Sequence, residues 1–231
     1  MATKQQKGNC YLCGAELGKV AMKNHIFKQH SDIADEQQCR LLKVEGADKR
    51  YWLFLDAPLT ASLQDIDDFL RRIWLECCGH MSAFMGPGYE EYPMSRKLIR
   101  FPEGTQLLYE YDFGDTTQLL VSILGRTRRK PQKEVVRLLA RNRPMEWKCA
   151  ECGQPADYIF PEQFYRNENP FLCEVCADKL DDMEMEMSLP VTNSPRMGVC
   201  AYEGKRDHYG FEEYAKCNNE SRNLSPRPIK E

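Results

Sequence analysis

Hydrophobic positions follow two different periods in the middle of the chain. The run YWLFLD (51–56) is aromatic and aliphatic and ends at Ala57-Pro58, which is typical of a buried strand. It is followed by SLQDIDDFLRRIWL (62–75), in which apolar residues recur at helical spacing. Ser62 and Asp65 stand in the relation of a capping box. We therefore predict a helix that packs its apolar stripe on a sheet.

A second pattern, TQLLYEYDFGDTTQLLVSIL (105–124), alternates with the period of two that strands require and predicts two strands joined at DFGD. The alternating apolar positions are Leu107, Tyr109 and Tyr111, answered by Leu119, Val121 and Ile123. Gly114 is predicted to supply the turn. Asp112 and Asp115 flank it, where aspartate commonly bonds nearby backbone amides, with a metal or substrate role as the alternative.

Three acidic residues in the first turns of the predicted helix, Asp65, Asp67 and Asp68, have a simple interpretation. Acidic side chains favour the positive end of the helix dipole. We expect a solvated helix N-terminus here rather than a catalytic carboxylate cluster.

Composition places the protein among soluble globular chains. The 231 residues are 42% hydrophobic and 29% charged, and no run approaches the roughly 18 apolar residues of a membrane span. The polar start, MATKQQKGN, shows no secretory signal, so we expect a cytoplasmic protein. Eleven cysteines in a reducing compartment are better explained by metal than by disulfides.

The first metal signal is CYLCGAELGKVAMKNHIFKQH (10–30). Cys10 and Cys13 form a C-x2-C knuckle followed by Gly14, and His25 and His30 lie in a predicted short helix. Two thiolates and two imidazoles suit tetrahedral zinc, and such a site leaves no position for a substrate. Its role would be folding or docking. A finger reading DNA would use residues 20–24, of which only Lys23 and Asn24 can contact bases, so base reading by this finger alone is not expected.

The second metal signal pairs Cys149 and Cys152 with Cys173 and Cys176 in a C-x2-C-x20-C-x2-C spacing. This spacing matches a zinc ribbon, and the DYIF sequence between the pairs is β-like. An iron–sulfur cluster or a redox dithiol is the alternative. The sequence thus predicts zinc as the cofactor, with two ions per chain.

Five further cysteines receive no metal assignment: Cys39, Cys77, Cys78, Cys200 and Cys217. Cys77 and Cys78 directly follow the apolar helix and are interpreted as small buried residues. A third cluster of Cys200, His208 and Cys217 is conceivable, but the spacing fits no knuckle.

Charge is segregated along the chain although the net charge is only −3. Residues 126–148 hold nine basic residues against two acidic ones, whereas residues 174–186 hold six acidic residues and one lysine. These segments neutralise each other across the fold, or are simply solvated faces, or leave a phosphate-binding patch. In the last case the predicted nucleic-acid contacts are Arg126, Arg128, Arg129 and Lys130.

Strand 51–56, helix 62–74, HMSAF (80–84) and the signature YEYDFGD (109–115) together resemble the plasmid-Ri ORF-three-like family, sometimes described as TnpR-type passenger proteins of insertion elements. The likeness covers about residues 51–125, and NSPRMGVCAY (193–202) is similar to the closing segment of metal-binding members. It implies a compact α+β domain and no defined activity. Thr117 and Leu119 stand where members usually carry a tryptophan and a histidine, so a site built on those side chains does not transfer. A serine resolvase would need a serine within an arginine cluster and a helix-turn-helix, and neither arrangement is found.

These observations predict an α+β fold with a mostly antiparallel sheet, packed helices, a zinc finger and a zinc ribbon. The predicted divisions are a finger at 1–36, an α+β domain at 40–127, a basic segment with the ribbon at 128–187, and a tail at 188–231 that wraps the body or stays mobile.

Two functions remain open. The first is a non-enzymatic zinc module that docks nucleic acid or a protein partner, with no membrane association and no small-molecule substrate expected. The second is a metal-assisted hydrolase or nuclease that uses Asp112, Asp115 and His80 in a cleft.

Overall fold

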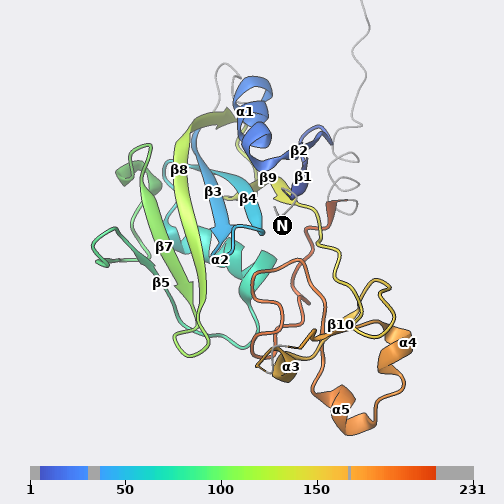
Figure 1. Ribbon diagram of the computed structural model, residues 1–231. Helices are drawn as coiled ribbons and strands as arrows, with labels where there is room; N and C mark the ends of the chain where they lie inside the picture. Colours follow the sequence, from blue (N-terminus) through green and yellow to red (C-terminus); the bar gives the residue numbers. More distant parts are fainter. Residues whose placement is uncertain (1–5, 31–36, 166–167, 212–231) are drawn as a thin grey trace, which may run out of the picture.

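An antiparallel sheet of nine strands runs through the centre of the computed structural model, which describes residues 6–30, 37–165 and 168–211 (Figure 1). The strand order is β2-β1-β9-β4-β3-β8-β7-β5-β6. The strands of this sheet are β1 (Lys7–Cys10), β2 (Glu16–Gly18), β3 (Gln37–Gly46), β4 (Trp52–Pro58), β5 (Ser82–Met85), β6 (Glu91–Tyr92), β7 (Gln106–Tyr111), β8 (Thr117–Arg129) and β9 (Arg137–Asn142). The expectation of an α+β fold built on a mostly antiparallel sheet is confirmed.

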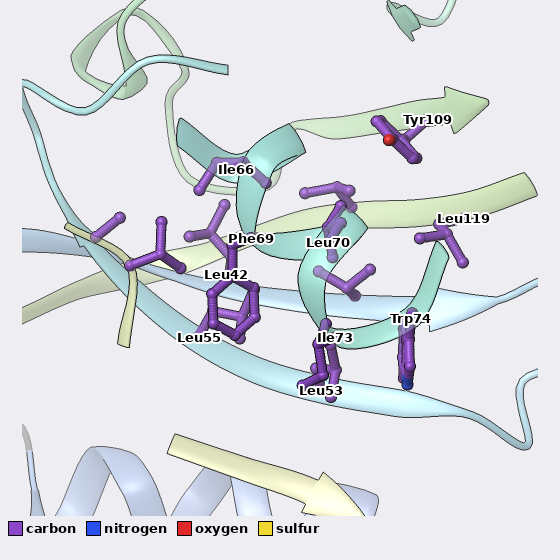
Figure 2. Close-up of a cluster of buried hydrophobic side chains, with 14 of the residues drawn as sticks. Leu42, Leu53, Leu55, Ile66, Phe69, Leu70, Ile73, Trp74, Tyr109 and Leu119 are labelled. Atoms are coloured by element: carbon purple, nitrogen blue, oxygen red, sulfur yellow. The ribbon is translucent and has the colours of Figure 1, made fainter. Parts of the chain in front are cut away.

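One face of the sheet is covered by the helix that the apolar pattern predicts. Helix α2 (Leu63–Leu70) continues directly into the π-helical turn η1 (Arg71–Leu75). The predicted capping box is present, because the amide of Ser62 donates to Asp65 and the amide of Asp65 donates to the Ser62 hydroxyl. Figure 2 shows the apolar stripe of this helix lying over β3, β4 and β8. The buried side chains labelled there are Leu42, Leu53, Leu55, Ile66, Phe69, Leu70, Ile73, Trp74, Tyr109 and Leu119.

The opposite face is covered by helix α1 (Lys19–Gln29), which follows the β1–β2 hairpin. Met22 and Ile26 of this helix are fully buried against Leu41, Trp52 and Phe54 of the sheet. Strand β1 also pairs with β9 from Gly8–Asn142 to Cys10–Ala140. The N-terminal finger is therefore built into the central sheet, and it shares a hydrophobic cluster with it.

The predicted hairpin at DFGD is present, with Leu107 opposite Val121 and Tyr109 opposite Leu119. The turn differs from the prediction in one respect. Asp112, and not Gly114, has the left-handed backbone, with φ of 65°. Its carboxylate accepts hydrogen bonds from the amides of Gly114 and Asp115, and these bonds stabilise an aspartate in the left-handed conformation.

Asp67 is buried, and the expectation that it belongs to a solvated helix N-terminus is wrong. Its carboxylate accepts the hydroxyls of Tyr109 and Ser82, each at 2.6 Å, and an N–H of Arg71 at 2.8 Å. Of its two acidic neighbours, Asp65 serves the capping box and Asp68 is exposed. A buried carboxylate needs such partners, and helical spacing alone does not reveal them.

A second, three-stranded sheet of order β11-β10-β12 holds the predicted ribbon. Its elements are β10 (Tyr158–Ile159), α3 (Pro161–Tyr165), β11 (Phe171–Leu172), α4 (Glu174–Ala177), α5 (Asp182–Glu186) and β12 (Leu189–Pro190). One short 3-10 helix, η2 (Leu98–Arg100), lies between β6 and β7. Among the helices in the described ranges, none combines the length and the apolar character that crossing a membrane would require.

The described part of the predicted tail wraps the body. Ser194 donates to the carbonyl of Trp74 at 2.6 Å, and Arg141 of β9 holds Asp207 through two N–H groups at 2.9 and 2.6 Å. Tyr11 of the finger donates to the carbonyl of Tyr209 at 2.6 Å. The C-terminal segment thus contacts both α2–η1 and the finger. The last predicted tail residues, 212–231 with Cys217, lie outside the described part.

Candidate metal centres

The finger brings its four predicted ligands together. Cys10 ends β1, Cys13 lies in the turn before β2, His25 is in α1 and His30 follows it. The sulfur of Cys10 is 3.6 Å from Nε2 of His30, and that of Cys13 is 3.2 Å from Nε2 of His25. All four ligand atoms lie within 4.8 Å of one another. A tetrahedral zinc ion separates a sulfur from a nitrogen by about 3.5 Å, so the donor set and the spacing fit zinc.

The ribbon brings its four cysteines together in the same way. Cys149 and Cys152 come from the turn before β10, whereas Cys173 precedes α4 and Cys176 lies in it. The sulfurs of Cys152 and Cys173 are 3.6 Å apart, close to the roughly 3.8 Å between two thiolates on tetrahedral zinc. These four sulfurs also lie within 4.8 Å of one another.

The finger knuckle at Cys10 and the first ribbon knuckle at Cys149 share one backbone geometry, which explains why both sequences read C-x2-C-G. In the finger the amide of Gly14 donates to the carbonyl of Cys10 at 2.8 Å, and in the ribbon the amide of Gly153 donates to Cys149 at 3.0 Å. Both glycines have left-handed φ values, 81° and 72°. Glycine adopts this conformation without a steric penalty, and it turns the chain so that both sulfurs of a knuckle face one point.

The electrostatic environment of the ribbon favours a metal-binding thiolate. Burial acts to raise the pKa of Cys149, but the backbone amides of Cys152, Cys173 and Glu151 outweigh it and lower that pKa to about 6. Burial and the neighbouring thiols raise the pKa of Cys176 to about 12. Four thiolates confined this closely would repel one another, so without a cation some of them stay protonated, and a bound divalent cation removes that conflict.

A third group of ligand atoms was not predicted. Cys77, Cys78, His80 and Cys200 also place their ligand atoms within 4.8 Å of one another. The interpretation of Cys77 and Cys78 as small buried residues is wrong, because Cys78 is exposed and Cys77 is half-buried. The group considered at the sequence level combined Cys200 with His208 and Cys217; His208 is exposed and is not part of the observed group. Within the described ranges there are therefore three Cys/His groups that could hold metal ions, one more than the two predicted. The available signal was the local CCGH sequence, but no spacing rule connects it to a cysteine 120 residues away.

The residues of the predicted hydrolase site come only partly together. Oδ2 of Asp112 lies 3.3 Å from Nε2 of His80. The same oxygen accepts an N–H of Arg196 at 2.6 Å, and the Arg196 side chain is fully buried. Asp115 is exposed, and its backbone carbonyl, rather than its carboxylate, accepts another N–H of Arg196. Asp112 is thus committed to a salt bridge, and His80 faces the thiols of the third group.

The basic segment is divided between the interior and the surface. Arg129 is only 2% exposed and pairs with the buried Asp56 at 3.0 Å, while Arg137 reaches the same carboxylate at 2.5 Å. The prediction that Arg129 contacts nucleic acid is therefore wrong. Arg126, Arg128 and Lys130 remain exposed at the end of β8 and beyond it.

Lys23 and Asn24, the finger residues that could contact bases, lie within α1, whose first residue is held by the sheet. The ammonium of Lys19, the first residue of α1, forms a salt bridge with Glu45 of β3 and also donates to the carbonyl of Lys49 at 3.2 Å. Asn24 is exposed and Lys23 is half-buried. Because the apolar side of α1 covers the sheet, the finger acts as a structural layer of the body.

No protein-family model matches the chain, and no curated protein matches it. Among solved structures, the chain is similar to the protein of unknown function MM3350 from Methanosarcina mazei Go1, at 18% identity and a TM-score of 0.38 over 46% of this chain and 68% of that chain.

Proposed function

We propose that this protein is a non-enzymatic binding module in which structural zinc ions stabilise a surface that contacts nucleic acid. The observation that carries the zinc assignment is the convergence of four soft ligands at both the finger and the ribbon. Each set supplies all four ligands of a tetrahedral zinc ion and leaves no open coordination position for a substrate. Such ions contribute to folding and not to chemistry.

The surface proposed for nucleic acid is the exposed end of β8, here called the basic end and defined by Arg126, Arg128 and Lys130. Arg126 and Arg128 point to the same side of the strand, because side chains two residues apart share a face. Gly125 approaches the ring of Phe27, so this end of β8 lies beside the second half of α1 (Figure 1). Exposed arginines and lysines without buried acidic partners are what phosphate groups require.

A titration against duplex DNA and single-stranded RNA tests the proposal. Because phosphate contacts dominate, we expect weak binding with little sequence preference that falls steeply as salt rises. Replacing Arg126, Arg128 and Lys130 together with glutamine should abolish binding and flatten the salt dependence. Arg129 must stay, since it is part of the interior.

The matched control exchanges Lys23 and Asn24 of the finger for glutamine and alanine, which should leave binding nearly unchanged. Absence of binding to both polymers at low salt contradicts the nucleic-acid assignment. Loss of binding in the finger variant alone would place the interface on α1 instead of the basic end.

A further inference from the structure

We propose that Cys77, Cys78, His80 and Cys200 bind a third zinc ion, which clamps the loop at 197–201 to the chain that follows η1. This inference does not depend on nucleic-acid binding. It rests on ligand geometry, on backbone conformation and on the way in which the C-terminal segment is held.

The distances within the group are those of a metal site. The sulfur of Cys78 lies 3.6 Å from that of Cys77 and 3.5 Å from that of Cys200. Nε2 of His80 is 3.0 Å from the Cys78 sulfur and 3.5 Å from the Cys200 sulfur. Tetrahedral zinc holds two sulfurs about 3.8 Å apart and a sulfur and a nitrogen about 3.5 Å apart. Ligand atoms in the finger and the ribbon lie at similar spacings of 3.1–3.6 Å.

The backbone is shaped to produce this convergence. Gly79, between Cys78 and His80, has φ of 81°, which brings the two flanking side chains to one point. Cys200 has φ of 54°, a left-handed conformation that cysteine rarely adopts. Such conformations cost energy and persist where surrounding interactions or function require them. A ligand bond to Cys200 supplies that requirement.

The surroundings suit the charge of the complex. Three thiolates and a neutral imidazole around Zn²⁺ carry one net negative charge. Nη2 of Arg196 lies 3.5 Å from the Cys77 sulfur and offsets part of this charge, because the same guanidinium also pairs with Asp112. The His80 ring packs edge-on against Tyr111 with centroids 5.8 Å apart, and this contact fixes its orientation. Outer contacts of this kind position metal ligands.

The loop at 197–201 is what the ion would fix. Arg196 and Tyr202, on either side of it, are buried, whereas the loop residues between them are half-buried or exposed. The loop has turn hydrogen bonds, such as the amide of Val199 to the carbonyl of Arg196 at 3.1 Å and the amide of Tyr202 to Val199 at 3.2 Å. An ion shared by Cys200 and residues 77–80 ties together segments that are more than a hundred residues apart in sequence.

Metal stoichiometry gives the first test. The full chain, purified without chelator under reducing conditions, is analysed by inductively coupled plasma mass spectrometry together with Cys200→Ser and Cys78→Ser. We expect three zinc ions in the wild type and two in each variant. Cys39→Ser is the matched control, because Cys39 is buried on β3 outside all three groups, and it should keep three.

Two zinc ions in the wild type, with every thiol shown to be reduced by intact mass, would overturn the site. A wild-type mass lower by two hydrogens that maps to a Cys78–Cys200 disulfide would overturn it as well. A third ion other than zinc would overturn the choice of metal.

Thiol protection locates the ion in the unmodified protein, where variant folding is not a concern. Cys78 and Cys200 are exposed, so without metal iodoacetamide at alkaline pH should reach and alkylate both of them. We expect peptide mapping to show both protected in the metal-loaded protein and reactive after chelation. Rapid alkylation of both in protein that retains three ions would contradict the assignment.

Hydrogen exchange tests the clamp itself. In Cys200→Ser the amides of Val199 and Tyr202 should exchange at least tenfold faster than in the wild type, while those of β3 and β8 should not change. Unchanged exchange at 197–202 in a variant that has lost one zinc ion would refute the clamp.

Discussion

Arg129 stands between two exposed residues, Arg128 and Lys130, yet its side chain is 2% exposed. Alternation along β8 sends it to the face of the sheet where the fully buried Asp56 lies. Asp67 is a similar case, an acid in a helix that turns inward to Tyr109. Arg129 and Asp67 are therefore interior residues because their side of the strand or helix faces the core. Their charge alone would have suggested a surface position.

Replacing Arg129 with glutamine should lower the free energy of unfolding by about 1–3 kcal/mol, because it removes one of the two arginines that hold the buried Asp56 and leaves Arg137 as the remaining charged partner. Arg128→Gln is the matched control one position away, and its effect should stay within about 0.5 kcal/mol. Urea unfolding of both variants measures this. Equal effects would mean that the pair of Arg129 with Asp56 contributes nothing.

Two elements of the finger, β1 and α1, hold it against the large sheet. β1 pairs with β9, and α1 buries Met22 and Ile26. Gly8 makes this pairing possible, because a Cβ there would lie 2.2 Å from the carbonyl oxygen of Arg141 and 2.4 Å from the Trp52 ring. Neither the Arg141 backbone nor the fully buried Trp52 ring can easily move away from such a Cβ.

Gly8→Ala should therefore destabilise the protein by about 1–3 kcal/mol and weaken zinc retention by the finger in a chelator competition, because β1 also carries Cys10. Gly114→Ala is the control. A Cβ there would meet its nearest neighbour, Oδ1 of Asp112, at 3.4 Å, and the backbone is not left-handed. Finding the two alanine variants equally stable would show that β1 can shift away from β9 at little cost.

The molecule as a whole has more than one hydrophobic cluster. The two clusters on either side of the large sheet include the finger, whereas the ribbon has its own cluster with Cys149, Phe160, Leu172 and Cys176. The ring of Trp147 stacks on that of Phe171 in the ribbon, with centroids 4.5 Å apart. The guanidinium of Arg50 from the body lies over the same Trp147 ring, 5.1 Å from its centroid. The ribbon thus has a small hydrophobic cluster of its own, which includes three of the four cysteines that could hold an ion.

Cys173→Ser should open the ribbon and leave the large sheet folded, because the loss of a ligand removes coupled metal binding and folding in that unit alone. Hydrogen exchange should show lost protection at Tyr158 and Leu172 and retained protection in β3 and β8. Cys39→Ser should cost less stability than Cys173→Ser, since Cys39 is no ligand. Simultaneous loss of protection in both sheets would show that the two units unfold together.

The sequence by itself determined the features that depend on short spacing. Periods of two and of 3.6 placed the hairpin of Leu107 and Val121 and the capped helix at Ser62, because local backbone geometry sets those periods. The C-x2-C-G knuckles likewise form within five residues. Each knuckle was assigned to a second pair of ligands, His25 and His30 or Cys173 and Cys176, because such spacings recur in zinc proteins.

Only the tertiary structure decided what depends on distant segments meeting. The packing of β4 and β8 in one sheet buried Arg129 against Asp56 and left Arg126, on the other side of β8, exposed. Chain return brought Cys200 to Cys78 and His80, across a separation in sequence that no local pattern records. Contacts of this kind form when whole sheets and helices pack their apolar faces together and exclude water between them. A single stretch of sequence does not carry that information.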